Sequence, residues 1–206
     1  CYNVANIGDL VDQNMNLVAF ENCVYDHKIK DFRPITKKDY ICYNTGYKLP
    51  KVNQKKRKVI TSLLKDIFGD DDTTNFFIDV VSMSLVTNSF EKIHVCTGTG
   101  GNGKSLIFGL ISRAFGKYYY NCDSQFLTTK YNGSRPNSTL FNCRNRRLIC
   151  VPEPQMNEND KELQFNVDFI KMITGKDEIT CRDLSKSNTT FIPTFTTFVH
   201  CNEKPT

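Results

Sequence analysis

The stretch from Gly98 to Ser105 reads G-T-G-G-N-G-K-S and constrains the fold more than any other part of the chain. Its spacing fits the phosphate-binding pattern G-x-x-x-x-G-K-[ST]. A glycine-rich turn lets successive backbone N–H groups point into one anion-binding concavity, and the positive end of a following helix favours phosphate. Lys104 can reach the β- and γ-phosphates, and the Ser105 hydroxyl can ligate Mg²⁺. The pattern therefore predicts a nucleotide-phosphate site built from strand, loop and helix.

The sequence on both sides of this loop supplies the elements that the pattern requires. A β-prone run precedes it at residues 92–97, and apolar residues recur at helical spacing over residues 106–115. We therefore expect the phosphates of a nucleotide to be bound by the residues Gly98, Thr99, Gly100, Gly101, Asn102, Gly103, Lys104 and Ser105.

Composition excludes several other classes of protein. Hydrophobic residues make up 39% of the 206 residues and charged residues 24%, as in ordinary globular domains. No run approaches the roughly 18 apolar residues that a membrane span needs, and no secretory signal opens the chain. The sequence begins at Cys1 rather than Met, which favours a segment of a longer protein.

The cysteines and histidines are scattered along the chain. The nine cysteines form no C-x-x-C pair and the three histidines are dispersed, so the sequence does not favour a zinc site. The odd count and the apolar neighbours of Cys96, Cys150 and Cys201 predict reduced, buried thiols in an intracellular protein. No local signature of a catalytic cysteine is visible.

The formal net charge of +5 permits a polyanionic partner but does not require one. Two basic clusters stand out in the sequence. Each is explained equally well by a solvated surface or by contact with nucleic acid, so both interpretations stay open. The first cluster contains Lys51, Lys55, Lys56, Arg57 and Lys58, and the second contains Arg144, Arg146 and Arg147.

The pattern along the chain predicts three regions. Residues 1–50 form a small β-rich segment, because short apolar runs alternate with polar turns from Met15 to Tyr47 and include a strand candidate at 40–43. Residues 51–91 form a helical region, with apolar residues at helical spacing over 60–68 and 76–86. Residues 92–206 form the core around the phosphate loop.

Three strands of this core define its functional edge. The runs 93–97, 147–151 and 196–201 are separated by helical stretches, which indicates an α/β fold with a parallel sheet. Glu153 follows the second run and Asn202 follows the third. Ligands bind at the carboxyl ends of parallel strands, so we expect Lys104, Glu153 and Asn202 to meet there, with Glu153 beside the metal and the attacking water.

Between the second and third strands, the sequence predicts a helix and a hairpin. Residues 161–174 carry an apolar face and end before Gly175. Two β-prone runs at 179–184 and 189–194 flank the polar turn 185–188, which places Lys186 near the tip of a β-hairpin.

These residues resemble viral superfamily 3 helicases, and most closely the primase–helicase family of poxviruses and other nucleocytoplasmic large DNA viruses, with related phage and plasmid primases. The resemblance extends from about Leu17 to Pro205. Its most discriminating stretch is Lys171–Arg182, and the others are Gly98–Ser105, Val151–Pro154 and Phe198–Pro205. The resemblance implies an AAA+-like P-loop NTPase sheet flanked by helices, after a small β-rich and helical N-terminal segment.

The resemblance also implies roles for single residues. Lys104 and Ser105 would bind phosphate and Mg²⁺, Glu153 would polarise water and contribute to the metal site, and Asn202 would be the sensor. Lys186 would contact the DNA backbone in the central channel of a homo-oligomeric ring, expected to be a hexamer. Asp177 and Arg182 match the family pattern without an assigned chemistry, although Asp177 could brace the hairpin. The place of action would be the cytoplasm or nucleus of a host cell.

The chain also departs from the family pattern. Pro152 stands where many members carry the first of two acids, and Lys176 where a second Gly is commoner. We expect the arginine finger after Asn202, supplied to a neighbouring subunit, so that this segment alone would hydrolyse ATP poorly.

Three other functions remain open from the sequence. They are an RNA-virus superfamily 3 ATPase, a small-molecule kinase with the same loop, and a non-catalytic nucleotide-binding module. The first would be stimulated by RNA, the second would need a lid and an acceptor pocket, and the third would bind ATP without turnover.

Overall fold

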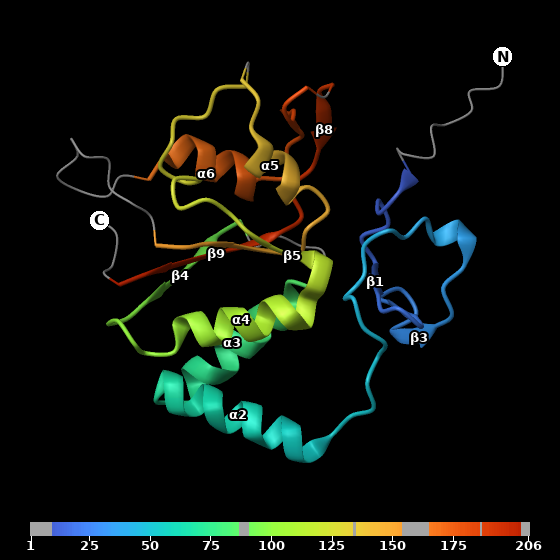
Figure 1. Cartoon of the computed structure of the whole chain (residues 1–206), viewed down its shortest axis with the longest axis vertical. Coiled ribbons are helices and arrows are strands. Elements are labelled where there is room, and N and C mark those ends of the chain that lie inside the picture. The colour runs from blue at the N-terminus through green and yellow to red at the C-terminus, as the bar shows by residue number, and fades with distance from the viewer. Residues whose placement is uncertain (1–9, 87–90, 134, 154–164, 186, 203–206) are drawn as a thin grey trace.

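The centre of the molecule is a parallel sheet of four strands, as the sequence predicted (Figure 1). This computed structural model describes residues 10–86, 91–133, 135–153, 165–185 and 187–202. The strands are β4 (Ile93–Thr97), β5 (Tyr119–Asn121), β6 (Leu148–Val151) and β9 (Thr196–Cys201), in the spatial order β4-β9-β6-β5. Thr97 pairs with Cys201 and Val151 with Val199, so the carboxyl ends of β4, β9 and β6 lie at one edge.

Helices cover both faces of this sheet. Figure 1 shows α2 (Gln54–Phe68), α3 (Asp71–Met83) and α4 (Lys104–Phe115) on one side. The other side carries α5 (Ser138–Cys143), α6 (Val167–Thr174) and the antiparallel hairpin of β7 (Ile179–Cys181) and β8 (Thr189–Phe191). The predicted hairpin is therefore present with shorter strands, while Lys186 lies outside the described residues.

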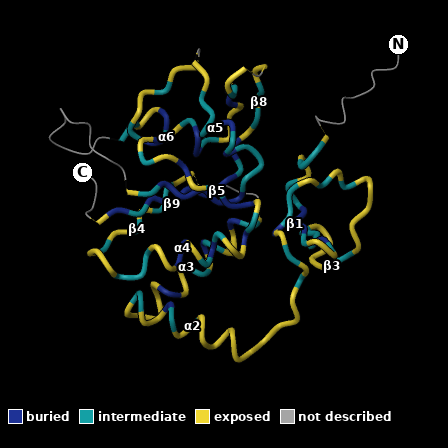
Figure 2. Tube along the Cα trace, in the orientation of Figure 1, coloured by how far each residue is buried: buried dark blue, intermediate teal, exposed yellow. Residues whose placement is uncertain are grey.

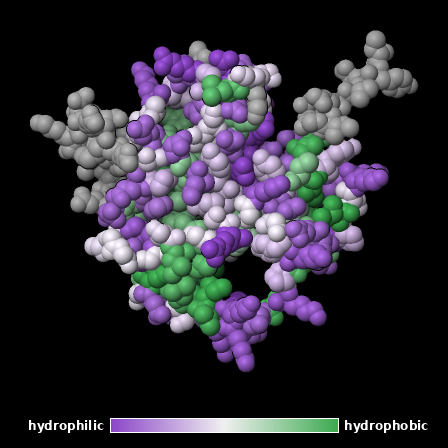
Figure 3. Space-filling view, in the orientation of Figure 1, coloured by the Kyte–Doolittle hydropathy of each residue, from purple (hydrophilic) through white to green (hydrophobic). Residues whose placement is uncertain are grey.

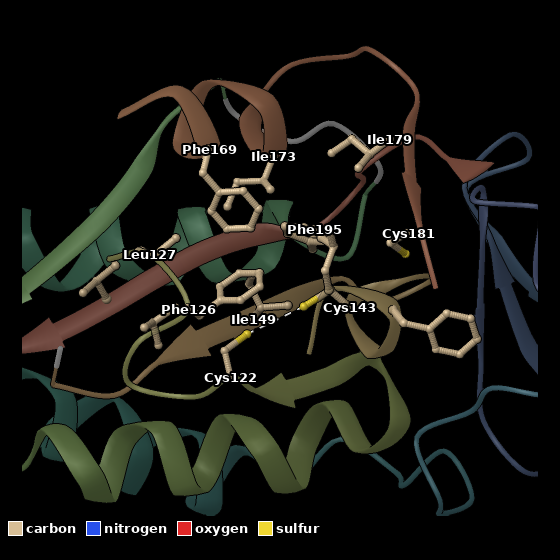
Figure 4. Packing of buried hydrophobic residues seen from close by; sticks show 14 residues of the cluster. Cys122, Phe126, Leu127, Cys143, Ile149, Phe169, Ile173, Ile179, Cys181 and Phe195 are labelled. Carbon is tan, nitrogen blue, oxygen red and sulfur yellow. Dashed lines mark hydrogen bonds between the residues drawn. The ribbon is translucent and has the colours of Figure 1, made fainter. Parts of the chain in front are cut away.

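Alternation along β6 divides the apolar core between the two faces. Leu148 and Cys150 pack with α2, α3 and α4, whereas Ile149 and Val151 pack with α5 and α6. Successive side chains of a strand point to opposite faces, so a run of four buried apolar residues serves both layers. The tube in Figure 2 shows this buried band at the centre of the sheet. On the second face, the buried Sγ atoms of Cys122 and Cys143 lie 3.6 Å apart (Figure 4).

Local sequence explains where the helices begin and end. The side chains of Asn53, Asp70 and Asn166 accept hydrogen bonds from backbone N–H groups in the first turns of α2, α3 and α6. Such caps satisfy donors that have no partner within the helix. Gly69 ends α2 with a φ of 81°, a left-handed conformation that glycine adopts without steric cost.

The N-terminal segment forms a small antiparallel sheet beside the main one. Its strands are β1 (Leu17–Ala19), β2 (Val24–Asp26) and β3 (Asp31–Arg33), followed by a 3-10 helix at Lys37–Asp39. A second 3-10 helix, Gly116–Tyr118, joins α4 to β5.

The strand that we expected at residues 40–43 is wrong. The backbone N–H groups of Cys42 and Tyr43 donate to the Asp12 carboxylate, at 2.7 and 2.9 Å, instead of to a neighbouring strand. A β-prone sequence therefore stays irregular here because a side chain satisfies its backbone donors.

Candidate nucleotide-binding site

The three polar residues predicted at the sheet edge lie close together in the structure. The phosphate loop follows β4, Asn202 follows β9, and Glu153 follows β6 after Pro152. Since β9 lies between β4 and β6, Asn202 stands between the other two groups. They border a pocket of about 420 Å³ together with Gly100–Leu106, His200 and Cys201.

The backbone conformation favours glycine at two positions of the loop. Gly98 has a φ of +154°, and an added Cβ there would lie 2.0 Å from Nδ2 of Asn102. Gly103 has a φ of +86°, and an added Cβ there would lie 2.8 Å from Cδ1 of Ile67 on α2. The loop therefore needs glycine both for its backbone conformation and for its close approach to neighbouring side chains.

Lys104 is the first residue of α4 and its ammonium group turns back over the loop. Nζ donates to the carbonyl oxygen of Gly98 and lies 3.5 Å from that of Thr99. It also lies 3.4 Å from Oδ1 of Asn202. The cation is thus held among neutral oxygen acceptors at the mouth of the loop, where a phosphate could replace them.

Asn202 also connects to the predicted catalytic acid. Its side-chain Nδ2 donates to Oε2 of Glu153 at 3.0 Å, and its backbone N–H approaches Oε1 at 3.4 Å. The three groups therefore form a continuous chain of cation, amide and carboxylate. An amide suits this position because it carries both a donor and an acceptor.

His200 belongs to the same pocket, although the sequence reasoning did not select it. Its ring stacks on Phe108 of α4, with centroids 5.2 Å apart. Burial lowers the pKa of His200, and the neighbouring Lys104 lowers it further. The signal was its place two residues before Asn202, near the carboxyl end of β9.

The neighbouring cysteines have the properties of packed thiols. Burial raises the pKa of Cys96 to about 11, and burial also raises the pKa of Cys201. Because the thiolate is the reactive form, these shifts favour inert thiols at neutral pH. Among the described residues, no group of three His, Cys, Asp or Glu side chains is placed to hold a metal ion.

A second, larger cavity adjoins the loop on the side of α3. It measures about 520 Å³ and shares Asn102 and Lys104 with the loop. Apolar side chains that include Phe76, Phe77 and Val95 line most of the remainder. The loop therefore lies between a polar pocket and an apolar one.

Asp177 and Arg182, which match the family pattern near the hairpin, lie away from the polar pocket beside the phosphate loop. Asp177 and Arg182 are absent from its lining in the described part of the chain. Asn137 donates its backbone N–H to the Arg182 carbonyl at 2.9 Å, and the Ser138 hydroxyl donates to Asp183 at 2.6 Å. Contacts of α5 with Arg182 and Asp183 therefore hold the hairpin base, and sequence reasoning had not selected Asp183.

Comparison with protein-family models identifies two regions. Residues 96–206 match the model described as "Family of unknown function (DUF5906)". Residues 4–69 match the model described as "D5 N terminal like". The first region contains the whole candidate site, and the second contains the small N-terminal sheet and α2.

Relatives of the chain occur in a mimivirus and in iridescent viruses. A mimivirus protein (Acanthamoeba polyphaga mimivirus), L207/L206, named as a putative helicase, is 34% identical over 200 residues, which are 95% of this chain and 20% of that protein. The protein 121R of Invertebrate iridescent virus 3, named in the same way, is 27% identical over 97% of this chain and 22% of its own length. The chain thus spans about a fifth of these relatives.

A solved structure has the same fold. The C-terminal region (305–718) of NrS-1 matches with a TM-score of 0.56 and 14% identity, over 71% of this chain and 34% of that chain. The family models and the viral relatives confirm the resemblance to viral primase–helicases, and the solved structure confirms the fold. In the described residues, no helix has the length and apolar character needed to cross a bilayer.

Proposed function

The chain belongs to the family of unknown function (DUF5906) and resembles the viral primase–helicases, and on that premise we propose that it is the ATP-hydrolysing motor core of a DNA helicase. One observation carries the proposal. Three polar residues follow three neighbouring parallel strands and line one pocket. Asn202 contacts Lys104 on one side and Glu153 on the other.

The chemistry of these side chains suits hydrolysis of a nucleoside triphosphate. The loop N–H groups and Lys104 would hold the phosphates, and the Glu153 carboxylate would accept a proton from the attacking water. Asn202, which contacts both groups, would respond to the terminal phosphate. Binding of the phosphates would draw Lys104 away from the Gly98 carbonyl and would alter the hydrogen bond between Asn202 and Glu153.

The residues present also fit a magnesium ion. The hydroxyl of Ser105 and the carboxylate of Glu153 border the same pocket, and Mg²⁺ prefers oxygen ligands. The bound ion would neutralise charge on the phosphate oxygens. Pro152 stands where many members of the resembled family carry a further acid, so Glu153 is the acid that follows β6 within the described residues.

The apolar cavity beside the loop supports a nucleotide rather than a free phosphate as the ligand. Its volume of about 520 Å³ and its aromatic lining suit a nucleobase attached to phosphates at Lys104. We propose that ATP places its triphosphate in the polar pocket and its base in this cavity.

DNA and other copies of the chain would complete the motor. The β7–β8 hairpin lies on the sheet face opposite α2, and its turn carries Lys186 in the sequence. A cation on such a hairpin would hold a DNA backbone without reading its bases. We propose a homo-oligomeric ring, most simply a hexamer, that acts inside a host cell and receives an arginine from a neighbouring subunit.

The proposal predicts that Lys104→Ala abolishes the motor. We expect ATP affinity to fall at least about tenfold, because the substitution removes a charge-assisted hydrogen bond to phosphate. Hydrolysis, its stimulation by single-stranded DNA and unwinding of a forked duplex should all fall to background. Calorimetry, phosphate release and strand-displacement assays measure these effects.

Lys28→Ala is the matched control, since Lys28 is an exposed lysine of the N-terminal segment, outside the pocket. It should behave as the parent chain does. If Lys104→Ala retains both hydrolysis and unwinding, the proposal is wrong. Stimulation by RNA but not DNA would favour an RNA-virus ATPase, phosphate transfer to a small acceptor would favour a kinase, and binding without turnover would favour a non-catalytic module.

A further inference from the structure

The structure separates the two basic clusters that looked alike in the sequence. In the second cluster, Arg147 is buried and donates to the carbonyls of Met15 and Leu17, at 2.7 and 3.1 Å. Arg146 donates to backbone carbonyls and stacks over Tyr43, and Arg144 lies 4.2 Å above the Phe141 ring. This cluster is therefore occupied by interactions within the protein.

The first basic cluster, at the start of α2, is exposed to solvent instead. Five residues of this cluster are exposed, and none takes part in an ion pair between described residues: Lys51, Lys55, Lys56, Arg57 and Lys58. We call these five residues the α2 basic cluster. All but Lys51 lie in the first third of the fifteen-residue helix α2, whose first turn contains no acid.

This placement works against the stability of the helix. The N-terminal end of a helix carries partial positive charge, so cations there are repelled while acids are favoured. Adjacent α3 follows the usual rule and begins with Asp71 and Asp72. The cations at the N-terminal end of α2 have no acid in the first turn to balance them. Their placement therefore favours a role in binding an anion from outside the chain.

A shallow groove next to the cluster supplies further donors. It measures about 350 Å³ and is lined by Gln54, Arg57, Lys58, Thr61, Ser62 and Lys65, all from α2. These side chains offer cations, hydroxyls and an amide but no carboxylate. Lys65 also pairs with Asp71 at 2.7 Å, in an exposed ion pair that a phosphate could replace.

We infer that the α2 basic cluster and this groove bind the phosphate backbone of duplex DNA. Arg57 and Lys65 are separated by about 12 Å along the helix axis, at 1.5 Å per residue. A duplex presents one negative charge for about every 1.7 Å of its axis, so both can reach phosphates at once. The groove contains no aromatic side chain on which an unpaired base could stack, which favours a duplex over a single strand.

No residue that lines this groove also lines the polar pocket or the apolar cavity of the candidate motor site, and the surface lies apart from the hairpin. In Figure 1, α2 and the β7–β8 hairpin lie on opposite sides of the sheet, and in Figure 3 hydrophilic side chains gather at the exposed end of α2. The inference thus goes beyond the proposed function: it assigns a nucleotide-independent interaction with duplex DNA, whereas the hairpin would hold the translocating strand.

The test is fluorescence anisotropy with a labelled 30-base-pair duplex, without nucleotide, in a Lys104→Ala background. This background separates the result from the ATPase proposal. The triple variant Lys55→Gln, Arg57→Gln, Lys58→Gln should bind the duplex about tenfold more weakly or worse at moderate salt. The slope of log affinity against log salt should become shallower by about 0.9 for each phosphate that the protein no longer neutralises.

Two further variants make the outcome decisive. The control Lys28→Gln, Lys37→Gln, Lys38→Gln removes the same charge from exposed positions of the N-terminal segment and should leave binding near the parent value. The variant Lys55→Arg, Arg57→Lys, Lys58→Arg keeps the charges and should bind as the parent does. Circular dichroism checks that all variants keep their helices.

Four results would overturn the inference. The first is unchanged duplex affinity and salt slope in the triple variant. The second is an equal fall in affinity in the control, which would mean that net charge alone matters. The third is competition by polyglutamate as strong as that by unlabelled duplex, which would assign the surface to an acidic protein. Stronger binding of a single strand or of duplex RNA than of duplex DNA would contradict the stated partner.

Discussion

At the scale of single residues, Asn202 shows why an amide side chain suits the position between Lys104 and Glu153. Its Oδ1 faces the Lys104 ammonium, while its Nδ2 donates to the Glu153 carboxylate. Aspartate would place a second negative charge beside Glu153, and alanine would remove both interactions. The amide therefore links the phosphate-binding cation to the acid in a way that a charged or apolar side chain could not.

We expect Asn202→Ala to separate binding from turnover. ATP affinity should stay within a few-fold of the parent, because the loop and Lys104 remain, whereas hydrolysis should fall about 100-fold, as when one positioned donor is removed from other active sites. Calorimetry and phosphate-release rates measure the two effects.

Asn75→Ala, an exposed substitution within α3, is the control and should change neither quantity. Equal reductions of affinity and rate in Asn202→Ala would assign that residue to ground-state binding instead.

At the scale of elements, the N-terminal sheet depends on interactions outside its ladders. Its strands have only three residues each, and such short strands are marginal by themselves. Arg33 on β3 pairs with Asp26 on β2 at 3.0 Å and with Asp39 of the following 3-10 helix at 2.8 Å. The side chain of Asp39 is only 9% exposed. This ion network therefore joins β2, β3 and the following turn.

The network predicts a loss of stability in acid. Hydrogen bonds from Arg33 hold the pKa of Asp39 well below its usual range. A carboxyl with a depressed folded-state pKa contributes stability above its unfolded-state pKa of about 3.9 and loses it as the pH falls further. Thermal unfolding at pH 7 and pH 3 should show this loss in the parent chain.

Asp39→Asn should lower stability by about 1–2 kcal/mol at pH 7 and flatten the pH dependence below pH 4. Asp66→Asn, at an exposed position of α2, is the control and should leave the pH profile as in the parent. Parallel pH profiles for the parent and Asp39→Asn would show that other carboxyls cause the acid sensitivity.

At the scale of the whole molecule, a joint around Tyr118 connects the small sheet to the main sheet. The Tyr118 hydroxyl donates to the Tyr43 carbonyl at 3.0 Å and accepts the Ala19 N–H at 2.9 Å. Arg147 reaches the same region from the start of β6, and burial lowers its pKa to about 10. The N-terminal segment is therefore held by polar interactions with the elements that follow α4.

Gly116, at the end of α4, sets the closeness of this joint. Its φ is +54°, and an added Cβ would lie 2.1 Å from the backbone oxygen of Thr45. Because backbone cannot move aside as a side chain can, Gly116→Ala should destabilise the protein by at least about 2 kcal/mol. Hydrogen exchange should accelerate first at Ala19 and Thr45.

Gly109→Ala is the matched control within α4. An added Cβ there meets nothing within 4 Å, so the change should stabilise the helix by about 0.5–1 kcal/mol. If Gly116→Ala melts at the parent temperature with unchanged exchange at Ala19, the joint is not as closely packed as we infer.

The sequence by itself determined the elements around the candidate site. The strands β4, β6 and β9, the helix after the phosphate loop and the hairpin were all predicted near their observed bounds. Their signals are local: alternation or helical spacing of apolar residues, a glycine-rich loop and turn residues lie within a few positions of one another. The roles of Lys104, Glu153 and Asn202 stay predictions, as do ATP, Mg²⁺ and the ring.

Only the tertiary structure decided which elements became neighbours. It also decided which basic side chains bond to other parts of the protein and which stay exposed. The last strand of the described chain, β9, lies between β4 and β6, which places Asn202 between Lys104 and Glu153. Arg147 is buried against carbonyls 130 and 132 residues away, whereas Lys55 and Lys58 stay exposed. Burial and strand order depend on packing between distant segments, and no local pattern carries that information.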